Sequence, residues 1–153
     1  MFDYQKAESS MTLAEGLDEY YAVHDNVTPP TEHRPEAAAL FRYHDIGHVV
    51  FGTTTNLLDE ARTDTWLLFG CDVGFVGYSG YFKLPEAKAA FDSVGWKTVV
   101  RQAWPITKAM AGVWRRTRSM RKKWPWTPPE SVFERPLHSL RDEWGIHVIT
   151  GPL

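Results

Sequence analysis

Hydrophobic residues recur at every third or fourth position through most of the chain, which is the spacing of amphipathic α-helices. Prolines, glycines and polar residues separate these stretches, and helical patterns outweigh strand patterns throughout. The pattern predicts helices over about 13–24, 35–51, 56–69, 84–93, 96–122 and 130–144. We therefore expect an all-α fold, with residues 1–153 forming one helical domain of six to seven helices and an extended C-terminal tail from residue 146.

Local signals place several helix boundaries. Thr12 and Glu15 form a capping-box pattern at the start of the first helix. Pro105 is expected to kink the long helix because proline lacks the N–H that a helix interior needs, and Gly145 is expected to stop the last helix. The glycine-rich, aromatic stretch 70–82 fits a loop or a close helix contact equally well.

Composition limits the class of protein. The 153 residues are 43% hydrophobic and 14% aromatic, as in a folded chain with a sizeable core. The lone Cys71 excludes an internal disulfide framework and a Cys-rich zinc module, and the net charge of −2 argues against a general nucleic-acid binder. The acidic N-terminus predicts no signal or transit peptide, and no apolar run is long enough to span a bilayer. We expect a cytoplasmic protein that is either free or peripheral to the inner face of a membrane.

A basic, tryptophan-rich stretch covers residues 114–126. Trp114, Trp124 and Trp126 stand among six arginines and lysines. Such a run is typical of an element that lies on a membrane surface, with rings at the headgroup level and cations toward anionic lipid. A solvated basic face or a phosphate-contacting patch explains the same residues, so both interpretations stay open.

The candidate chemistry lies on the helix expected at 35–51 and on the next one. His44 and His48 are four residues apart and share one helix face, and Asp45 can lean into the same space. Glu60 lies about one turn into the following helix. Apolar neighbours predict that these groups are buried, where imidazoles and carboxylates need a partner or a metal. The spacing predicts a site for zinc, iron or manganese, although a surface or core histidine pair is the plain alternative.

The motif His-Asp-x-x-His, followed by eleven residues and Glu, resembles the signature of the Coq-four family, the fourth Coq protein of ubiquinone biosynthesis. In this chain it consists of His44, Asp45, His48 and Glu60. Residues 55–60 resemble the lead into the family's glutamate, and residues 133–137 and 140–146 resemble its C-terminal ending.

The resemblance implies one divalent ion held by His44, Asp45, His48 and Glu60, which are also the implied catalytic residues. Zinc is the preferred ion, with iron, manganese or magnesium as alternatives. It further implies a membrane-peripheral lyase or oxidative decarboxylase that acts on a polyprenylated aromatic ring and replaces the ring carboxylate by a hydroxyl. The lipid tail would lie in an apolar channel between helices. Other quinone-biosynthesis enzymes and a second copy of the chain are the implied protein partners.

Two rival functions fit parts of the same pattern. The His44-Asp45 pair also looks like that of metal-dependent phosphohydrolases, which need one more histidine upstream and one more aspartate downstream. The available residues are His24 or His33, and Asp64, Asp72 or Asp92. The second rival is a non-catalytic lipid-binding scaffold with a structural metal, which a closed ligand shell would favour over an open one.

Overall fold

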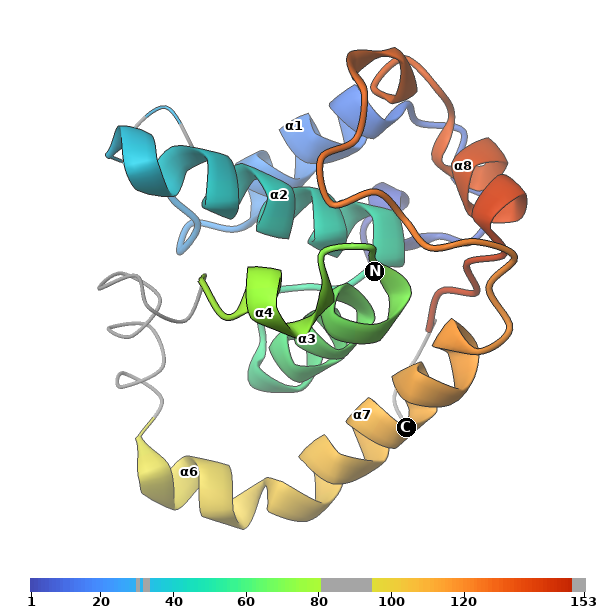
Figure 1. Ribbon diagram of the computed structural model, residues 1–153. Helices are drawn as coiled ribbons and strands as arrows, with labels where there is room; N and C mark the ends of the chain where they lie inside the picture. Colours follow the sequence, from blue (N-terminus) through green and yellow to red (C-terminus); the bar gives the residue numbers. More distant parts are fainter. Residues whose placement is uncertain (30, 32–33, 81–94, 150–153) are drawn as a thin grey trace.

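Helices account for all the regular secondary structure in the computed structural model, which describes residues 1–29, 31, 34–80 and 95–149 (Figure 1). Within these residues there are seven α-helices and no strand, so the all-α prediction is confirmed. The predicted helix at 84–93 and the end of the tail lie outside the described residues. The helices are α1 (Leu13–Val23), α2 (Pro35–Phe51), α3 (Leu57–Gly70), α4 (Gly74–Tyr78), α6 (Trp96–Arg101), α7 (Ala103–Thr117) and α8 (Leu137–Trp144).

The helices that carry the candidate site have the ends that local sequence rules predict. At α1, the Thr12 hydroxyl accepts from the Glu15 N–H, and the Glu15 carboxylate accepts from the Thr12 N–H. Helix α2 ends at Gly52, whose φ of +71° favours glycine. The Asn56 side chain caps α3 by accepting from the backbone N–H groups of Leu58 and Asp59.

The expected long helix at 96–122 is interrupted near Pro105, as predicted, but it ends earlier than predicted. The structure divides it at Gln102 into α6 and α7, and α7 ends at Thr117 rather than near residue 122. Pro105 is the third residue of α7 and has no N–H to donate to the carbonyl of Arg101, four residues earlier. The break therefore lies one turn before the proline.

The last helix is shorter than predicted. Residues Glu130–Val132 form a 3₁₀ turn, and α8 begins only at Leu137. Pro136 has no N–H and disfavours helical geometry at Arg135, which explains the interruption. Gly145 ends α8 with a φ of +69°, as predicted.

The core forms where α2 packs between α1 and α3. The rings of Phe51 and Trp66 stack 4.7 Å apart and are fully buried. Gly47 lets the two helices approach, because a Cβ atom there would lie only 2.8 Å from Leu67 Cδ2. The close approach of α2 and α3 occurs between His44 and His48, so the core contact also positions the candidate site.

Arg141 on α8 stabilises the C-terminal end of α2 through hydrogen bonds to its backbone carbonyls. Arg141 is 3% exposed, and its guanidinium donates to the carbonyls of Val49 (2.8 Å) and Val50 (2.9 Å) in the last turn of α2. It also donates to the carbonyls of Tyr4 and Lys6, both at 2.6 Å. Burial lowers the pKa of Arg141 to about 10, so the side chain stays charged at neutral pH. A cation at this position also complements the negative end of the α2 dipole.

The basic, tryptophan-rich stretch does not form one surface element. Trp124 is 2% exposed and packs against the Trp144 ring, 4.9 Å away. Trp126 contacts the rings of Tyr43 and Tyr78. Two of the three tryptophans in this stretch thus serve packing, and Trp114 alone of the three is exposed. None of the described helices has the length and apolarity needed to cross a membrane.

Candidate metal centre

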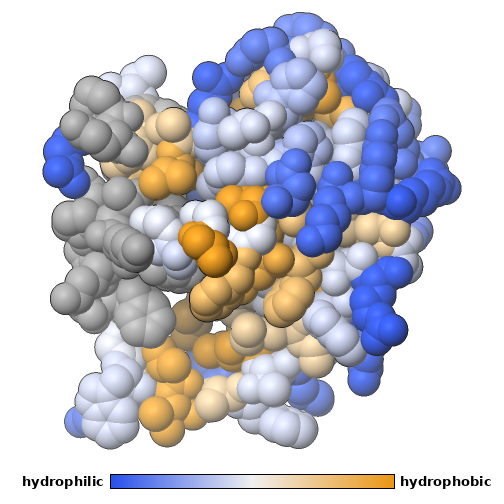
Figure 2. All heavy atoms as spheres, in the orientation of Figure 1, coloured by the Kyte–Doolittle hydropathy of each residue, from blue (hydrophilic) through white to orange (hydrophobic). Residues whose placement is uncertain are grey.

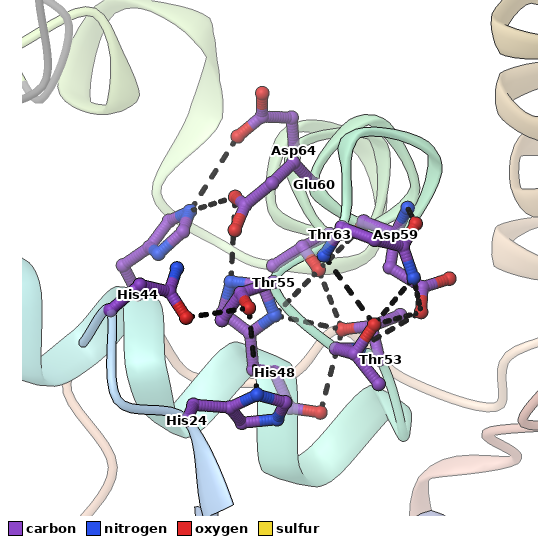
Figure 3. Close-up of polar contacts among 12 residues, drawn as sticks. His24, His44, His48, Thr53, Thr55, Asp59, Glu60, Thr63 and Asp64 are labelled. Carbon is purple, nitrogen blue, oxygen red and sulfur yellow. Dashed lines mark hydrogen bonds and ion pairs between the residues drawn. The ribbon is translucent and has the colours of Figure 1, made fainter. Parts of the chain in front are cut away.

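Helices α2 and α3 turn three metal-ligating side chains toward one another (Figure 3). One ligand atom each from His44, His48 and Glu60 lies within 4.8 Å of the others. Glu60 Oε2 is 3.5 Å from His48 Nε2 and 3.9 Å from His44 Nε2. Both histidines are buried, whereas the Glu60 side chain is 37% exposed. The cluster therefore has two buried imidazoles and one carboxylate that reaches solvent.

The separations of Glu60 from the two imidazoles fit a single ion. Ligands at about 2.1 Å from a tetrahedral metal lie about 3.4 Å from one another. The two distances from Glu60 are close to that value, so small side-chain movements would complete the geometry. His48 Nε2 is buried and makes no hydrogen bond within the described part of the chain, which is the condition of a ligand atom. Two histidines and one glutamate could hold a metal ion and leave a coordination position for water or substrate.

Two threonines orient His48. Its Nδ1 lies 3.1 Å from Thr53 Oγ1 and 3.2 Å from Thr63 Oγ1. Thr63 donates its hydroxyl proton to the Asp59 carbonyl, so its oxygen can accept from the imidazole. The Tyr20 ring stacks on His48 at 5.3 Å. A proton held on Nδ1 leaves the lone pair on Nε2 facing Glu60, and this is the tautomer that metal binding through Nε2 requires.

Asp45, the fourth ligand that the resemblance implied, points elsewhere. Its Oδ2 accepts a hydrogen bond from the Tyr21 hydroxyl on α1 at 2.9 Å, and the residue is buried. Adjacent residues project about 100° apart around a helix, which separates Asp45 from His44. The structure thus brings together three of the four predicted site residues and leaves Asp45 outside the group of possible ligands.

Asp64, which the sequence offered only as one of three aspartates for a phosphohydrolase, is a second carboxylate at this centre. Its Oδ1 lies 3.6 Å from His44 Nε2 and accepts from the Tyr78 hydroxyl. The signal was available, because Glu60 and Asp64 are four residues apart on α3, as His44 and His48 are on α2. The two helices therefore present two imidazoles and two carboxylates across their interface.

The two carboxyls of α2 and α3 titrate differently. Burial alone would raise the pKa of Glu60, but the imidazoles of His48, His44 and His24 outweigh it and hold the pKa below its usual value. Burial raises the pKa of Asp45 to about 7, and the opposing effects of His44 and Tyr21 are smaller. Glu60 is thus the ionised ligand near neutral pH, whereas Asp45 is about half protonated.

Asp45→Asn is expected to keep the metal and to remove a pH dependence of stability. The folded protein binds the Asp45 proton more tightly than the unfolded chain, so the free energy of unfolding should fall as pH rises from about 4 to 7. In chelator-treated protein, the variant should lack this slope and be more stable at pH 8, by up to about 4 kcal/mol. Urea unfolding at several pH values tests this, and identical slopes in the two proteins would contradict it.

A phosphohydrolase needs one more histidine and one more aspartate beside His44 and Asp45, and two of the candidates for these ligands have other partners. His24 Nε2 lies 3.1 Å from the Tyr4 hydroxyl, and its Nδ1 lies 3.5 Å from Thr55 Oγ1. Asp72 accepts from the backbone N–H of Trp126. Of the candidates for that function, only Asp64 lies beside the metal-ligating histidines in the described structure, while His33 and Asp92 fall outside it.

Comparison with known proteins adds no neighbour. No family model matches the chain, and no curated protein and no solved structure matches it either. The metal centre therefore stands on its own geometry, and the resemblance to the Coq-four family stands on the residues quoted for it above.

Proposed function

We propose that this protein is a metal-dependent enzyme that acts on a polyprenylated aromatic acid in ubiquinone or related quinone biosynthesis. The convergence of His44, His48 and Glu60, with one coordination position left over, supports the metal-dependent part. Zinc is the preferred ion, and iron, manganese or magnesium are alternatives. The resemblance to the Coq-four family supports the substrate class. It also supports the proposal that the protein works at a membrane surface beside other quinone-biosynthesis enzymes.

An apolar groove between α3 and α7 supports a lipid substrate. Phe69 and Thr65 on α3 and Met110 and Trp114 on α7 line a cavity of about 340 Å³, on a different side of α3 from Glu60 and Asp64. Figure 2 shows hydrophobic atoms on both sides of a hollow between α3 and α7. Exposed apolar side chains that face one another across a groove are typical of a ligand site, and an isoprenoid tail has the matching chemistry.

The proposed reaction consumes water and dioxygen: the ring carboxylic acid leaves as carbon dioxide, water supplies the hydroxyl, and dioxygen takes up the two electrons and two protons as hydrogen peroxide. A bound divalent ion supplies positive charge that can hold the carboxylate or an adjoining phenol oxygen. His44, His48 and Glu60 would hold the ion. The Asp64 carboxylate is partly exposed beside His44, where it can accept the proton of a ring hydroxyl.

A phosphohydrolase is the second candidate, because Asp64 lies beside His44 as that function requires. Its remaining needs are poorly met by the described residues. Both ring nitrogens of His24 face hydroxyl groups, and the Asp45 carboxylate accepts from Tyr21.

The test offers both kinds of substrate to protein loaded with each metal in turn. We expect labelled carbon dioxide from a carboxyl-labelled polyprenyl hydroxybenzoate in detergent micelles under air. Asp64→Asn should slow this release by about 100-fold or more, while Glu134→Ala, on an exposed surface, should not change it. Phosphate release from nucleotides without carbon dioxide would establish the phosphohydrolase instead. Tight lipid binding without turnover would establish the scaffold.

A further inference from the structure

Positive charge is concentrated in one part of the chain. Residues 95–129 contain nine of the seventeen lysines and arginines and none of the nineteen aspartates and glutamates. The rest of the protein is therefore strongly acidic, although the whole chain has a net charge of only −2. This basic segment includes α6 and α7, which form an arc along the lower edge of the molecule in Figure 1.

Large apolar side chains are exposed on the same arc. Trp96, Val100 and Trp104 follow one another at intervals of four residues, with exposed fractions of 71%, 63% and 70%. Trp96 and Val100 lie one turn apart on one side of α6, and Trp104 lies near the start of α7, beyond the break at Gln102. None of the three belongs to the buried core. Two exposed tryptophans and an exposed valine within nine residues are unusual on a surface that meets only water.

Three basic side chains on the same two helices are exposed to solvent. Lys97, Arg101 and Lys108 are exposed and make no ion pair with any residue that the structure describes. By contrast, Arg121 and Lys122, later in the basic segment, pair with Asp142 and Glu143. Lys108 Nζ lies 5.8 Å from the Trp104 ring, so a cation and an aromatic face are presented together.

We propose that residues 96–108, here called the docking arm, bind the protein to an anionic lipid membrane. Trp96, Val100 and Trp104 would enter the headgroup region, where tryptophan is enriched, and Lys97, Arg101 and Lys108 would contact lipid phosphates. The docking arm contains two helical stretches of six residues each, 96–101 and 103–108, and each extends over about 9 Å along the membrane plane. The acidic remainder of the protein is repelled by the same lipids, so the arm sets the orientation of docking.

Charge favours a membrane over a second copy of this chain. Two docking arms placed face to face would oppose like charges across the contact. The proposal goes beyond the metal centre and does not depend on it, because the docking arm contains none of the residues that could hold the ion.

Vesicle binding tests the proposal directly. We expect the full chain to bind vesicles of phosphatidylcholine with one-third phosphatidylglycerol, to bind neutral phosphatidylcholine vesicles much more weakly, and to dissociate as salt is raised. Lys97→Gln/Arg101→Gln should weaken binding about 30-fold, since each cation near the surface contributes about a factor of five. Trp96→Ser/Trp104→Ser should also weaken it, with unchanged circular dichroism.

The matched control is Lys6→Gln/Lys122→Gln, which removes the same charge from two cations that already pair with Asp3 and Glu143. It should bind as the wild type does. Equal affinity for neutral and anionic vesicles, or equal losses in the two charge variants, would overturn the proposal. The proposal would also be overturned if the wild-type protein is a dimer in solution and Trp96→Ser/Trp104→Ser is a monomer, because the arm would then bind a second copy of the chain. Glu60→Ala should bind vesicles normally, so failure of the metal proposal and failure of docking give different results.

Discussion

Glu60→Ala is expected to purify without the divalent ion, whereas the wild-type protein should carry about one equivalent. Glu60 is the only carboxylate among the described residues within 4.8 Å of both histidine ligand atoms, and its low pKa keeps it ionised at neutral pH. Two imidazoles alone provide neither the charge nor the third donor that a stable site needs. We expect metal affinity to fall more than about 100-fold, since even outer-shell changes cost about 10- to 100-fold. Elemental analysis and competition with a chromophoric chelator measure the loss.

The fold should survive this change. The Glu60 side chain is partly exposed, and its removal leaves the stacked pair of Phe51 and Trp66 in place. His44→Ala should likewise lose the metal and keep the helical core. Glu134→Ala, which removes an exposed glutamate at a distance from α2 and α3 in the sequence, is the matched control and should keep a full equivalent. A full equivalent of metal in Glu60→Ala would show that the ligand set is wrong.

Arg141→Met is expected to destabilise the protein by about 3–5 kcal/mol, because it leaves several buried carbonyls without a donor at about 1–3 kcal/mol each. Methionine can fill similar space but donates no hydrogen bond. The carbonyls of Tyr4, Lys6, Val49 and Val50 would lose their donations from the guanidinium, and leaving such buried acceptors unsatisfied is costly. Urea unfolding followed by circular dichroism measures the difference.

Two related variants make the Arg141 prediction specific. Arg141→Lys keeps the charge but lacks the planar fork that reaches four carbonyls, so it should recover only part of the stability. Arg135→Met removes a cation from the partly exposed pair with Glu143 and should cost no more than about 1 kcal/mol. Equal losses in Arg141→Met and Arg135→Met would contradict the role given to the buried guanidinium.

This role links the C-terminal stretch 140–146 to the metal centre. Val49 and Val50 follow His48 directly, so Arg141 fixes the turn of α2 that carries one of the candidate metal ligands.

Helix positions were largely predictable because local chemistry sets them. The Thr12–Glu15 capping box and the glycines at 52 and 145 act within a few residues of the backbone they terminate. The boundaries were less exact where a proline acts at a distance. Pro105 moved the break back to Gln102, and Pro136 delayed the start of α8. The burial of Trp124 depends on Trp144, twenty residues later, and no local pattern reports such a contact.

The candidate site was predictable where it depends on local helical spacing. The prediction failed where a side chain is directed by a residue on another helix. Helical spacing placed His44 beside His48, and the short connection to α3 brought Glu60 opposite them. The side chain of Asp45 is directed by Tyr21 on another helix, which the sequence pattern could not show. Asp64 obeys the same four-residue rule as the histidines and follows from it once α3 is known to face α2.

X-ray absorption at the metal edge of the loaded protein tests the central claim most directly, because imidazole ligands give a distinct multiple-scattering signal. We predict two imidazoles and one carboxylate around a single ion, with the remaining coordination by water, and one imidazole in His48→Ala. A third imidazole, a sulfur ligand or a second metal nearby would contradict the centre formed by His44, His48 and Glu60.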